Sequence, residues 1–134
     1  MVNLKTKGTV AERDLLHKFW ENGWACIRVA GSGNMGFPSP DLLAGNGVKS
    51  IAIECKAFKN SHKYLEAEEI NQSKLFGEKF GAEPWLAIKF NRQPWYLLKL
   101  TDLNKTEKCW SISLTLAEQK GLKFEQFLQL NQKI

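Results

Sequence analysis

The sequence contains little cysteine and histidine, and this scarcity excludes two common kinds of small protein. It has three cysteines and two histidines in 134 residues. Cys26, Cys55 and Cys109 form neither a CxxC pair nor a Cys/His ligand spacing. An odd number of cysteines without such spacing argues against a disulfide framework and a zinc site, and it suits a reducing cytosol. We therefore expect a cytoplasmic protein.

Long hydrophobic runs are also missing. No stretch of about 18 consecutive apolar residues occurs, so we expect no membrane-spanning helix and no membrane partner. Residues 1–14 lack the apolar core of a secretory signal. Hydrophobic residues make up 43% of the chain and charged residues 25%, which is typical of a soluble globular domain. No repeat or linker interrupts the sequence, so residues 1–134 are expected to form a single domain.

Acidic residues are fewer than basic ones. The 14 Asp and Glu residues face 19 Lys and Arg residues, which gives a formal net charge of +5. A basic surface attracts polyanions through its summed potential and through release of counterions, so nucleic acid is a natural partner. Charge alone does not decide the matter, because many basic domains bind no nucleic acid.

The spacing of apolar residues predicts an α/β or α+β fold, a β-sheet flanked by helices. A first helix should begin at the T-x-x-E capping box of Thr9 and Glu12 and end at Asn22-Gly23. Gly81 should close a second helix, in which Ile70, Phe76 and Phe80 are expected to be buried. The predicted strands cover 24–30, 41–45, 48–58, 85–90, 95–100 and 109–112, and the predicted later helices cover 66–80 and 124–130.

Charged residues concentrate around one predicted hairpin. Pro40-Asp41 opens its first strand, Asn46-Gly47 is a strong turn signal, and Glu54-Cys55-Lys56 lies on its second strand. Residues two apart on a strand share a face, so Glu54 and Lys56 should project together, away from the apolar face. A tight hairpin could bring the Asp41 carboxylate beside Glu54. The sequence thus predicts two carboxylates and one ammonium at one edge of a small sheet.

Such a group is suited to phosphodiester hydrolysis. Two adjacent carboxylates repel each other unless one is protonated or a cation lies between them. Mg²⁺ prefers hard oxygen ligands and can polarise a phosphoryl oxygen while activating a bound water. A lysine adds a compact positive charge that can stabilise the charge that develops on the phosphate.

The motif Pro40-Asp41 … Glu54-Cys55-Lys56 resembles the PD-(D/E)xK signature of restriction-endonuclease-like nucleases. From about residue 7 to about residue 100 the chain resembles the archaeal Holliday-junction resolvase family, through the ordered segments 7–8, 11–15, 28–32, 41–47 and 53–56. The resemblance implies a restriction-endonuclease-like mixed sheet. It also implies a Mg²⁺-dependent, structure-selective endonuclease, with Mn²⁺ able to substitute. This enzyme would resolve four-way DNA junctions in recombination and repair by paired phosphodiester hydrolysis.

The resemblance also assigns roles to single residues. It implies an acidic metal cluster with the Cys55 backbone carbonyl as a further ligand, a catalytic lysine, a catalytic serine in the Gly-rich loop, basic residues that bind DNA, and a homodimer contact. By this resemblance Glu12, Asp41 and Glu54 would form the acidic cluster, Lys56 would be the catalytic lysine and Ser32 the catalytic serine. Arg13 and Arg28 would bind DNA, and Phe76 and Phe80 would form the dimer contact. From their position after the charged strand, Lys59 and Lys63 are further candidates for contact with the DNA backbone.

Each of these residues also has an ordinary structural interpretation. Glu12 could simply complete the capping box, Asp41 could be a turn residue, and Ser32 could belong to a flexible connector. Glu54 and Lys56 could form a solvated strand face, as could Lys59 and Lys63. Arg28 could make a structural ion pair, and Phe76 and Phe80 could fill the core of the monomer.

Two functional alternatives stay open. One is a related restriction-like or viral repair nuclease that acts on duplex DNA; the other is a non-catalytic DNA-binding protein of the same fold. The loop between Ser32 and Asp41 is longer than in compact family members, and residues 101–134 form a C-terminal extension of uncertain role. By resemblance, replication or recombination proteins are further candidate partners, and the protein would associate with the nucleoid.

Overall fold

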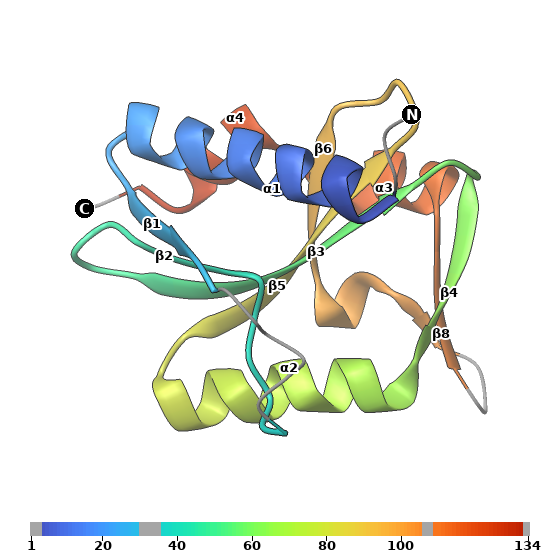
Figure 1. The fold of residues 1–134 in the computed structure, drawn as a ribbon, viewed down its shortest axis with the longest axis horizontal. Coiled ribbons are helices and arrows are strands. Elements are labelled where there is room, and N and C mark those ends of the chain that lie inside the picture. Colours follow the sequence, from blue (N-terminus) through green and yellow to red (C-terminus); the bar gives the residue numbers. More distant parts are fainter. Residues whose placement is uncertain (1–3, 30–35, 106–108, 133–134) are drawn as a thin grey trace.

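The computed structural model describes residues 4–29, 36–105 and 109–132 (Figure 1). Two sheets form within them, one of six strands in the order β1-β2-β3-β5-β6-β9 and one of three strands in the order β4-β8-β7. The helices are α1 (Leu4–Glu21), α2 (Ala67–Phe80), α3 (Leu114–Lys120), α4 (Phe124–Leu130) and the 3₁₀ turn η1 (Leu100–Asp102). The strands are β1 (Ala25–Arg28), β2 (Leu42–Gly45), β3 (Ser50–Phe58), β4 (His62–Glu66), β5 (Glu83–Phe90), β6 (Trp95–Lys99), β7 (Asn104–Lys105), β8 (Cys109–Ser113) and β9 (Leu122–Lys123).

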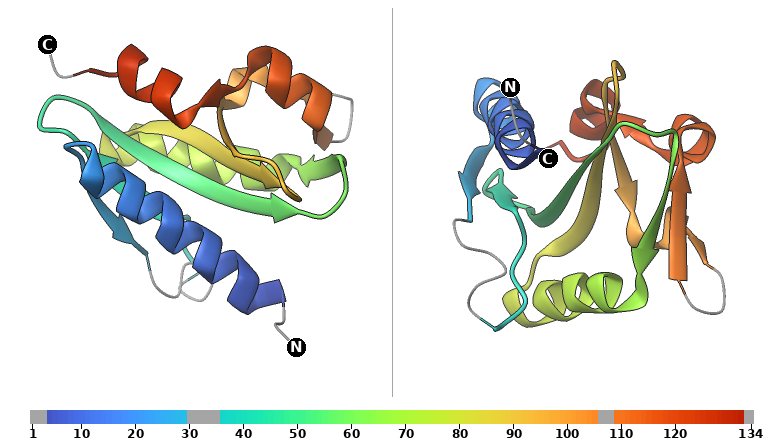
Figure 2. Two further views of the ribbon diagram at one scale, coloured as in Figure 1. Left: turned by 90° about the horizontal axis from the view of Figure 1, so that it is seen from above. Right: turned by 45° about the vertical axis from the view of Figure 1, so that its right-hand side comes forward.

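The larger sheet is mixed, as the family resemblance implies. β1, β2 and β3 pair antiparallel, β3 pairs parallel with β5, and β5, β6 and β9 pair antiparallel. A parallel pair requires a crossover connection, which β4 and α2 provide here. The smaller sheet begins in the same crossover, where β4 runs beside β8 (Figure 2).

Helices cover the two faces of the larger sheet. α1 and α4 lie on one side and α2 on the other (Figures 1 and 2). The first core cluster joins Leu15 and Phe19 of α1 to Phe124 and Phe127 of α4 against the sheet. The second cluster packs Ile70 of α2 with residues of β5, β6, β8 and α3. The result is a mixed α/β single domain.

The alternation predicted for β3 is confirmed. Ile51 and Ile53 are fully buried in the first core cluster, and Cys55 packs against the same cluster. Glu54 and Lys56 point to the opposite face, where α2 lies, and both are partly exposed. The predicted edge position is wrong, because β3 lies between β2 and β5 inside the sheet. β3 pairs from Ile51 to Phe58 with β5, a partner that the local pattern does not reveal.

The turn between β2 and β3 is longer than the predicted two-residue hairpin. Asn46 N–H donates to the Lys49 carbonyl at 3.1 Å, and the Asn46 side-chain oxygen accepts the N–H groups of Val48 and Lys49 at 3.0 and 2.8 Å. Gly47 takes φ 92°, in the left-handed region that favours glycine. The side chain of Asn46 thus organises the turn and delays the start of β3 to Ser50.

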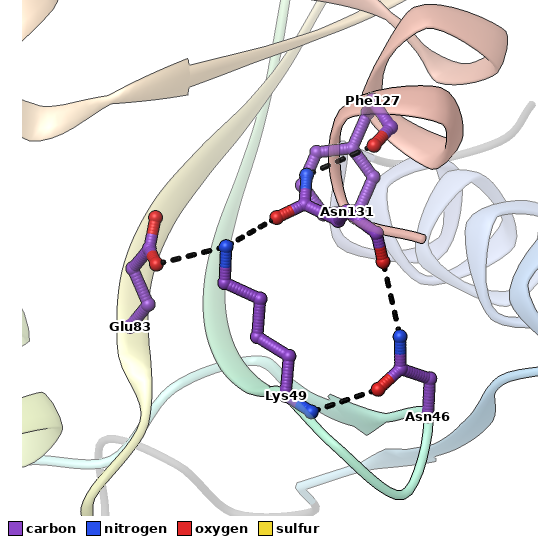
Figure 3. A network of polar contacts seen from close by, with 5 residues as sticks. All are labelled: Asn46, Lys49, Glu83, Phe127 and Asn131. Carbon is purple, nitrogen blue, oxygen red and sulfur yellow. Dashed lines mark hydrogen bonds and ion pairs between the residues drawn. The ribbon is translucent and has the colours of Figure 1, made fainter. Parts of the chain in front are cut away.

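This turn is joined to the C-terminal segment by a polar network (Figure 3). The buried Asn46 donates to the Asn131 carbonyl at 3.0 Å, and Lys49 Nζ donates to Asn131 Oδ1 at 2.6 Å. Asn131 donates in turn to the Phe127 carbonyl at 2.9 Å, while Lys49 pairs with Glu83 at 3.3 Å. Together with the core residues of α4, these bonds make residues 122–131 part of the domain core.

Several predicted boundaries differ from the structure. α1 begins at Leu4, so Thr9 lies inside the helix and the predicted capping box is wrong; no proline stops the helix upstream of it. The strand predicted over 24–30 is shorter, and its last residue lies outside the described residues. β4 and α3 were not predicted, because β4 is polar and mostly exposed and α3 is only seven residues long. The strand near 109–112 and the helix over 124–130 are confirmed.

Two aromatic residues of α2 are less buried than predicted. Ile70 is buried as expected, but Phe80 is 58% exposed and Phe76 is half-buried. Trp20 is 56% exposed, and its indole N–H donates to the Cys26 carbonyl at 2.9 Å.

Within the part of the chain that the structure describes, no helix combines the length and apolar character needed to cross a membrane.

Candidate active site

Asp41 lies where β2 begins and extends the pairing of β2 with β3. Its N–H donates to the Ile53 carbonyl at 3.0 Å, and its carbonyl accepts the Val29 N–H at 2.9 Å. Its side-chain Oδ2 accepts the Cys55 N–H at 2.8 Å. The Asp41 carboxylate therefore lies beside β3, in the position that the next residue of a paired strand would otherwise occupy. Because the N–H and C=O of one strand residue point to the same side, the Cys55 carbonyl faces this carboxylate as well.

The carboxyl group of Glu54 lies against that of Asp41, as predicted. Burial, the negative charge of Asp41, a hydrogen bond with Asp41 and the charge of Glu69 together raise the pKa of Glu54 to about 8, against a partial opposing effect of Lys56. A shift of this size is typical of two carboxyl groups that share one site. At neutral pH the pair retains a proton unless a cation neutralises it.

The donor set fits a small hard cation. Asp41, Glu54 and the Cys55 carbonyl offer oxygen ligands, and Mg²⁺ is usually held by one or two carboxylates together with waters and substrate phosphates. Over residues 4–29, 36–105 and 109–132, no group of three or more His, Cys, Asp or Glu side chains is arranged to hold a metal ion. Asp41 and Glu54 form the pair of adjacent carboxyl groups at this centre.

Glu12 has a different partner. Its Oε2 accepts a hydrogen bond from Arg28 Nε at 2.9 Å, and this ion pair joins α1 to the end of β1. The side chains are 18% and 34% exposed, so the pair is partly shielded from water. The structural interpretation of Arg28 as an ion-pair residue is thus observed, with the Glu12 carboxylate as its partner.

Lys56 has a partner that the sequence does not reveal. Its Nζ donates to Glu69 Oε1 at 2.9 Å and lies 4.0 Å from Glu54 Oε1. Burial would lower the pKa of Lys56, but the hydrogen bond to Glu69 and the charges of Glu69, Glu54 and Asp41 outweigh burial and raise it. Lys56 is therefore an ammonium group at neutral pH.

A cavity of about 210 Å³ opens beside these groups, between residues 37–40, β3 and α2. Glu54 and Glu69 line it together with Gln72, Ser73 and Phe76. Glu54 of the acidic pair and Glu69, the partner of Lys56, thus face an open space. The loop before Asp41 contributes one wall through Phe37, which is 79% exposed.

The remaining predicted residues are spread around this centre. Arg13 on α1, Lys59 after β3 and Lys63 on β4 are exposed, and Lys63 Nζ lies 5.9 Å from the ring centroid of Phe58. Ser32 lies outside the described residues. Phe76 and Phe80 stack on each other one turn apart, with ring centroids 5.2 Å apart and an interplanar angle of 16°. The interpretation that both aromatics fill the monomer core is wrong, because Phe80 is largely exposed.

The raised pKa of Glu54 predicts a pH dependence of stability in the absence of divalent cations. The folded state keeps a proton on Glu54 up to about pH 8, whereas the unfolded chain releases it near 4.5. The contribution of Glu54 to the free energy of unfolding is therefore fully present below about pH 4.5 and is lost as the pH rises through about 8. Urea denaturation in EDTA at pH 5, 6.5 and 8 should show this fall, and Glu54→Gln should flatten it. Equal pH slopes in both proteins would contradict the shift.

Comparison with known proteins shows the family of this chain. The family model described as archaeal Holliday junction resolvase (Hjc) matches residues 3–134. The chain is 43% identical to the crossover junction endodeoxyribonuclease Hjc of Archaeoglobus fulgidus, over 92% of this chain and 96% of the relative. It is 31% identical to the crossover junction endodeoxyribonuclease Hjc of Sulfolobus acidocaldarius, over 93% of this chain and 88% of that relative. The solved structure of A. fulgidus Hjc, a Holliday junction resolvase, superposes with a TM-score of 0.82 at 42% identity, covering 90% of this chain and 98% of that one. The chain therefore belongs to the archaeal Holliday junction resolvase (Hjc) family.

Proposed function

We propose that this protein is a Mg²⁺-dependent, structure-selective endonuclease that resolves four-way DNA junctions as a homodimer. The contact between the Asp41 and Glu54 carboxyl groups beside Lys56 carries the proposal. Family membership supports it, since the relatives are named crossover junction endodeoxyribonucleases. The basic net charge suits a DNA substrate that is bound mainly through its phosphates.

The residues of the site would divide the work as follows. Asp41, Glu54 and the Cys55 carbonyl would hold Mg²⁺, which when bound polarises a phosphoryl oxygen and lowers the pKa of a bound water. The Lys56 ammonium would stabilise the negative charge that develops on the phosphate. Glu12 remains a proposed member of this centre, and its Oε2 is held by Arg28 in the structure.

Contacts to DNA are proposed on either side of this centre. The exposed Arg13, Lys59 and Lys63 would neutralise phosphates on the arms of the junction, and Arg28 would do so from the end of β1. Ser32 is kept as a proposed catalytic residue on the strength of the resemblance. We propose that these contacts read the shape of the junction and its backbone rather than its base sequence.

The dimer follows from the reaction. A junction is released into two duplexes only when two opposed strands are cut, and this chain carries one Asp41–Glu54–Lys56 group. A two-fold dimer supplies two such groups through a self-complementary surface. The exposed Phe80 and its stacked, half-buried neighbour Phe76 are our candidates for that surface, because an exposed aromatic ring is an anchor that a partner can bury.

The proposal predicts cleavage of a synthetic four-way junction with Mg²⁺ and no cleavage in EDTA. A linear duplex with the sequence of one arm is the matched substrate and should be cut far more slowly, because it lacks the junction geometry. Products are measured on denaturing gels, with Mn²⁺ as a second cation. Equal cleavage of junction and duplex would indicate a general duplex nuclease, and binding without cleavage under any cation would indicate a non-catalytic DNA-binding protein.

The same substrate tests the paired sites. Mixed dimers of wild-type chains and Glu54→Gln chains should nick one strand of each junction and fail to complete resolution within one complex. Full resolution by mixed dimers, or a wild-type protein that sediments as a monomer when bound to the junction, would contradict the two-site arrangement.

A further inference from the structure

We propose that Glu69 is a positioning residue for Lys56, holding the ammonium group of that lysine at the reaction centre. The inference rests on the proposed function, and it assigns a role to a residue outside the PD-(D/E)xK pattern. Lys56 Nζ forms a 2.9 Å hydrogen bond with Glu69 Oε1, whereas its distance to Glu54 Oε1 is 4.0 Å. The first distance is that of a charge-assisted hydrogen bond, and the second exceeds hydrogen-bond length. Glu69 is therefore the closer partner of the lysine.

Glu69 is itself held in place by the start of α2. It is the N3 residue of a capping box whose N-cap is Glu66, and its Oε2 accepts the Glu66 N–H at 3.3 Å. One carboxylate oxygen thus belongs to the helix cap and the other to Lys56. The two contacts together fix the orientation of the carboxylate, because each uses a different oxygen atom.

The helix that carries Glu69 is firmly attached to the sheet. Ile70, the next residue, is 1% exposed in the second core cluster. At the other end of α2, Gly77 lies so close to Ala82 that a Cβ atom at Gly77 would be 2.6 Å from the Ala82 carbonyl oxygen. The position of the carboxylate is therefore set by the packing of a whole helix rather than by one flexible side chain.

This attachment matters because a lysine is difficult to place. Its four-carbon stem rotates freely, and a misplacement of about 1 Å near the reacting atoms can lower a rate by about 100-fold. The hydrogen bond to Glu69 removes much of that freedom. It also keeps Nζ from closing directly onto Glu54, so that the carboxylate oxygens of Glu54 stay available to a cation.

The test is Glu69→Gln, with Glu68→Gln as the matched control. Glutamine can keep the helix cap, as Gln126 shows at the N3 position of α4, where its side-chain oxygen accepts the Lys123 N–H at 2.9 Å. Glu68 lies in the same first turn but accepts a hydrogen bond from Gln72 at 3.2 Å. Both substitutions remove one negative charge near the start of α2, and only one of them removes the charged partner of Lys56.

We expect Glu69→Gln to lower the single-turnover rate of junction cleavage about 100-fold at saturating protein. Junction affinity in EDTA and the melting temperature should stay at wild-type values, and Glu68→Gln should match wild type throughout. NMR order parameters of the Lys56 ammonium group, measured without DNA or metal, should fall in Glu69→Gln alone.

Three results would overturn the positioning role: wild-type cleavage by Glu69→Gln, an equal loss in Glu68→Gln, or an unchanged Lys56 order parameter. A fall in melting temperature that accompanies the slower cleavage would instead assign Glu69 a structural role and also overturn it. A wild-type chain that cuts no DNA would refute the proposed function, and the NMR comparison would still decide whether Glu69 holds Lys56.

Discussion

Asp41→Asn and Glu54→Gln are each expected to lower the rate of junction cleavage by about 10³-fold or more while leaving junction binding intact. Both substitutions keep the size and hydrogen-bonding shape of the side chain, so the Cys55 N–H can still donate to residue 41. They remove the charge that would hold a divalent cation. Less negative charge beside the DNA could also tighten binding. Cleavage time courses with Mg²⁺ and fluorescence anisotropy in EDTA measure the two effects separately.

Glu125→Gln is a suitable control for these variants. Glu125 is an exposed carboxylate at the start of α4, which packs on the opposite face of the sheet from Glu54. Its substitution removes the same charge and should leave cleavage at the wild-type rate. If junction affinity fell in parallel with activity in Asp41→Asn or Glu54→Gln, these residues would be contacts for DNA rather than ligands for a metal ion.

Phe127→Ala is expected to destabilise the protein by about 3–5 kcal/mol, because it opens a cavity in a packed aromatic cluster. Phe127 is fully buried, and its ring meets those of Trp85, Trp24 and Phe19 at centroid distances of 4.9, 5.8 and 6.0 Å. Leu130→Ala on the same helix is the matched control. Leu130 is 62% exposed, so this change should stay within about 0.5 kcal/mol of wild type.

Urea denaturation measures both variants, and the comparison decides the role of the C-terminal segment. A loss confined to Phe127→Ala would show that α4 unfolds together with the sheet. Below its melting temperature this variant should still cut junctions, because Phe127 lies in the core cluster on the α1 side of the sheet. If Phe127→Ala lowered the free energy of unfolding as little as Leu130→Ala, the packing of α4 would not be needed for the stability of the fold.

Much of the local structure could be predicted from the sequence. The alternation along β3, the end of α2 at Gly81 and the helix over 124–130 were all readable, because each depends on residues close together in the chain. Gly81 takes φ 84°, which a glycine adopts without strain. By contrast, the T-x-x-E pattern at Thr9 misled, because the same letters also occur inside a helix.

The sequence by itself determined that Glu54 and Lys56 share one face of a strand and that Asp41 can approach them, since strand alternation and a short connection are local properties. Only the tertiary structure decided which partners the charged residues take. Glu69 is 13 residues from Lys56 on a helix, and Glu12 is 16 residues from Arg28 on another. No periodic pattern encodes such pairs, because their distances depend on how helices pack against the sheet. For the same reason, only the folded chain shows that the C-terminal aromatics complete the core.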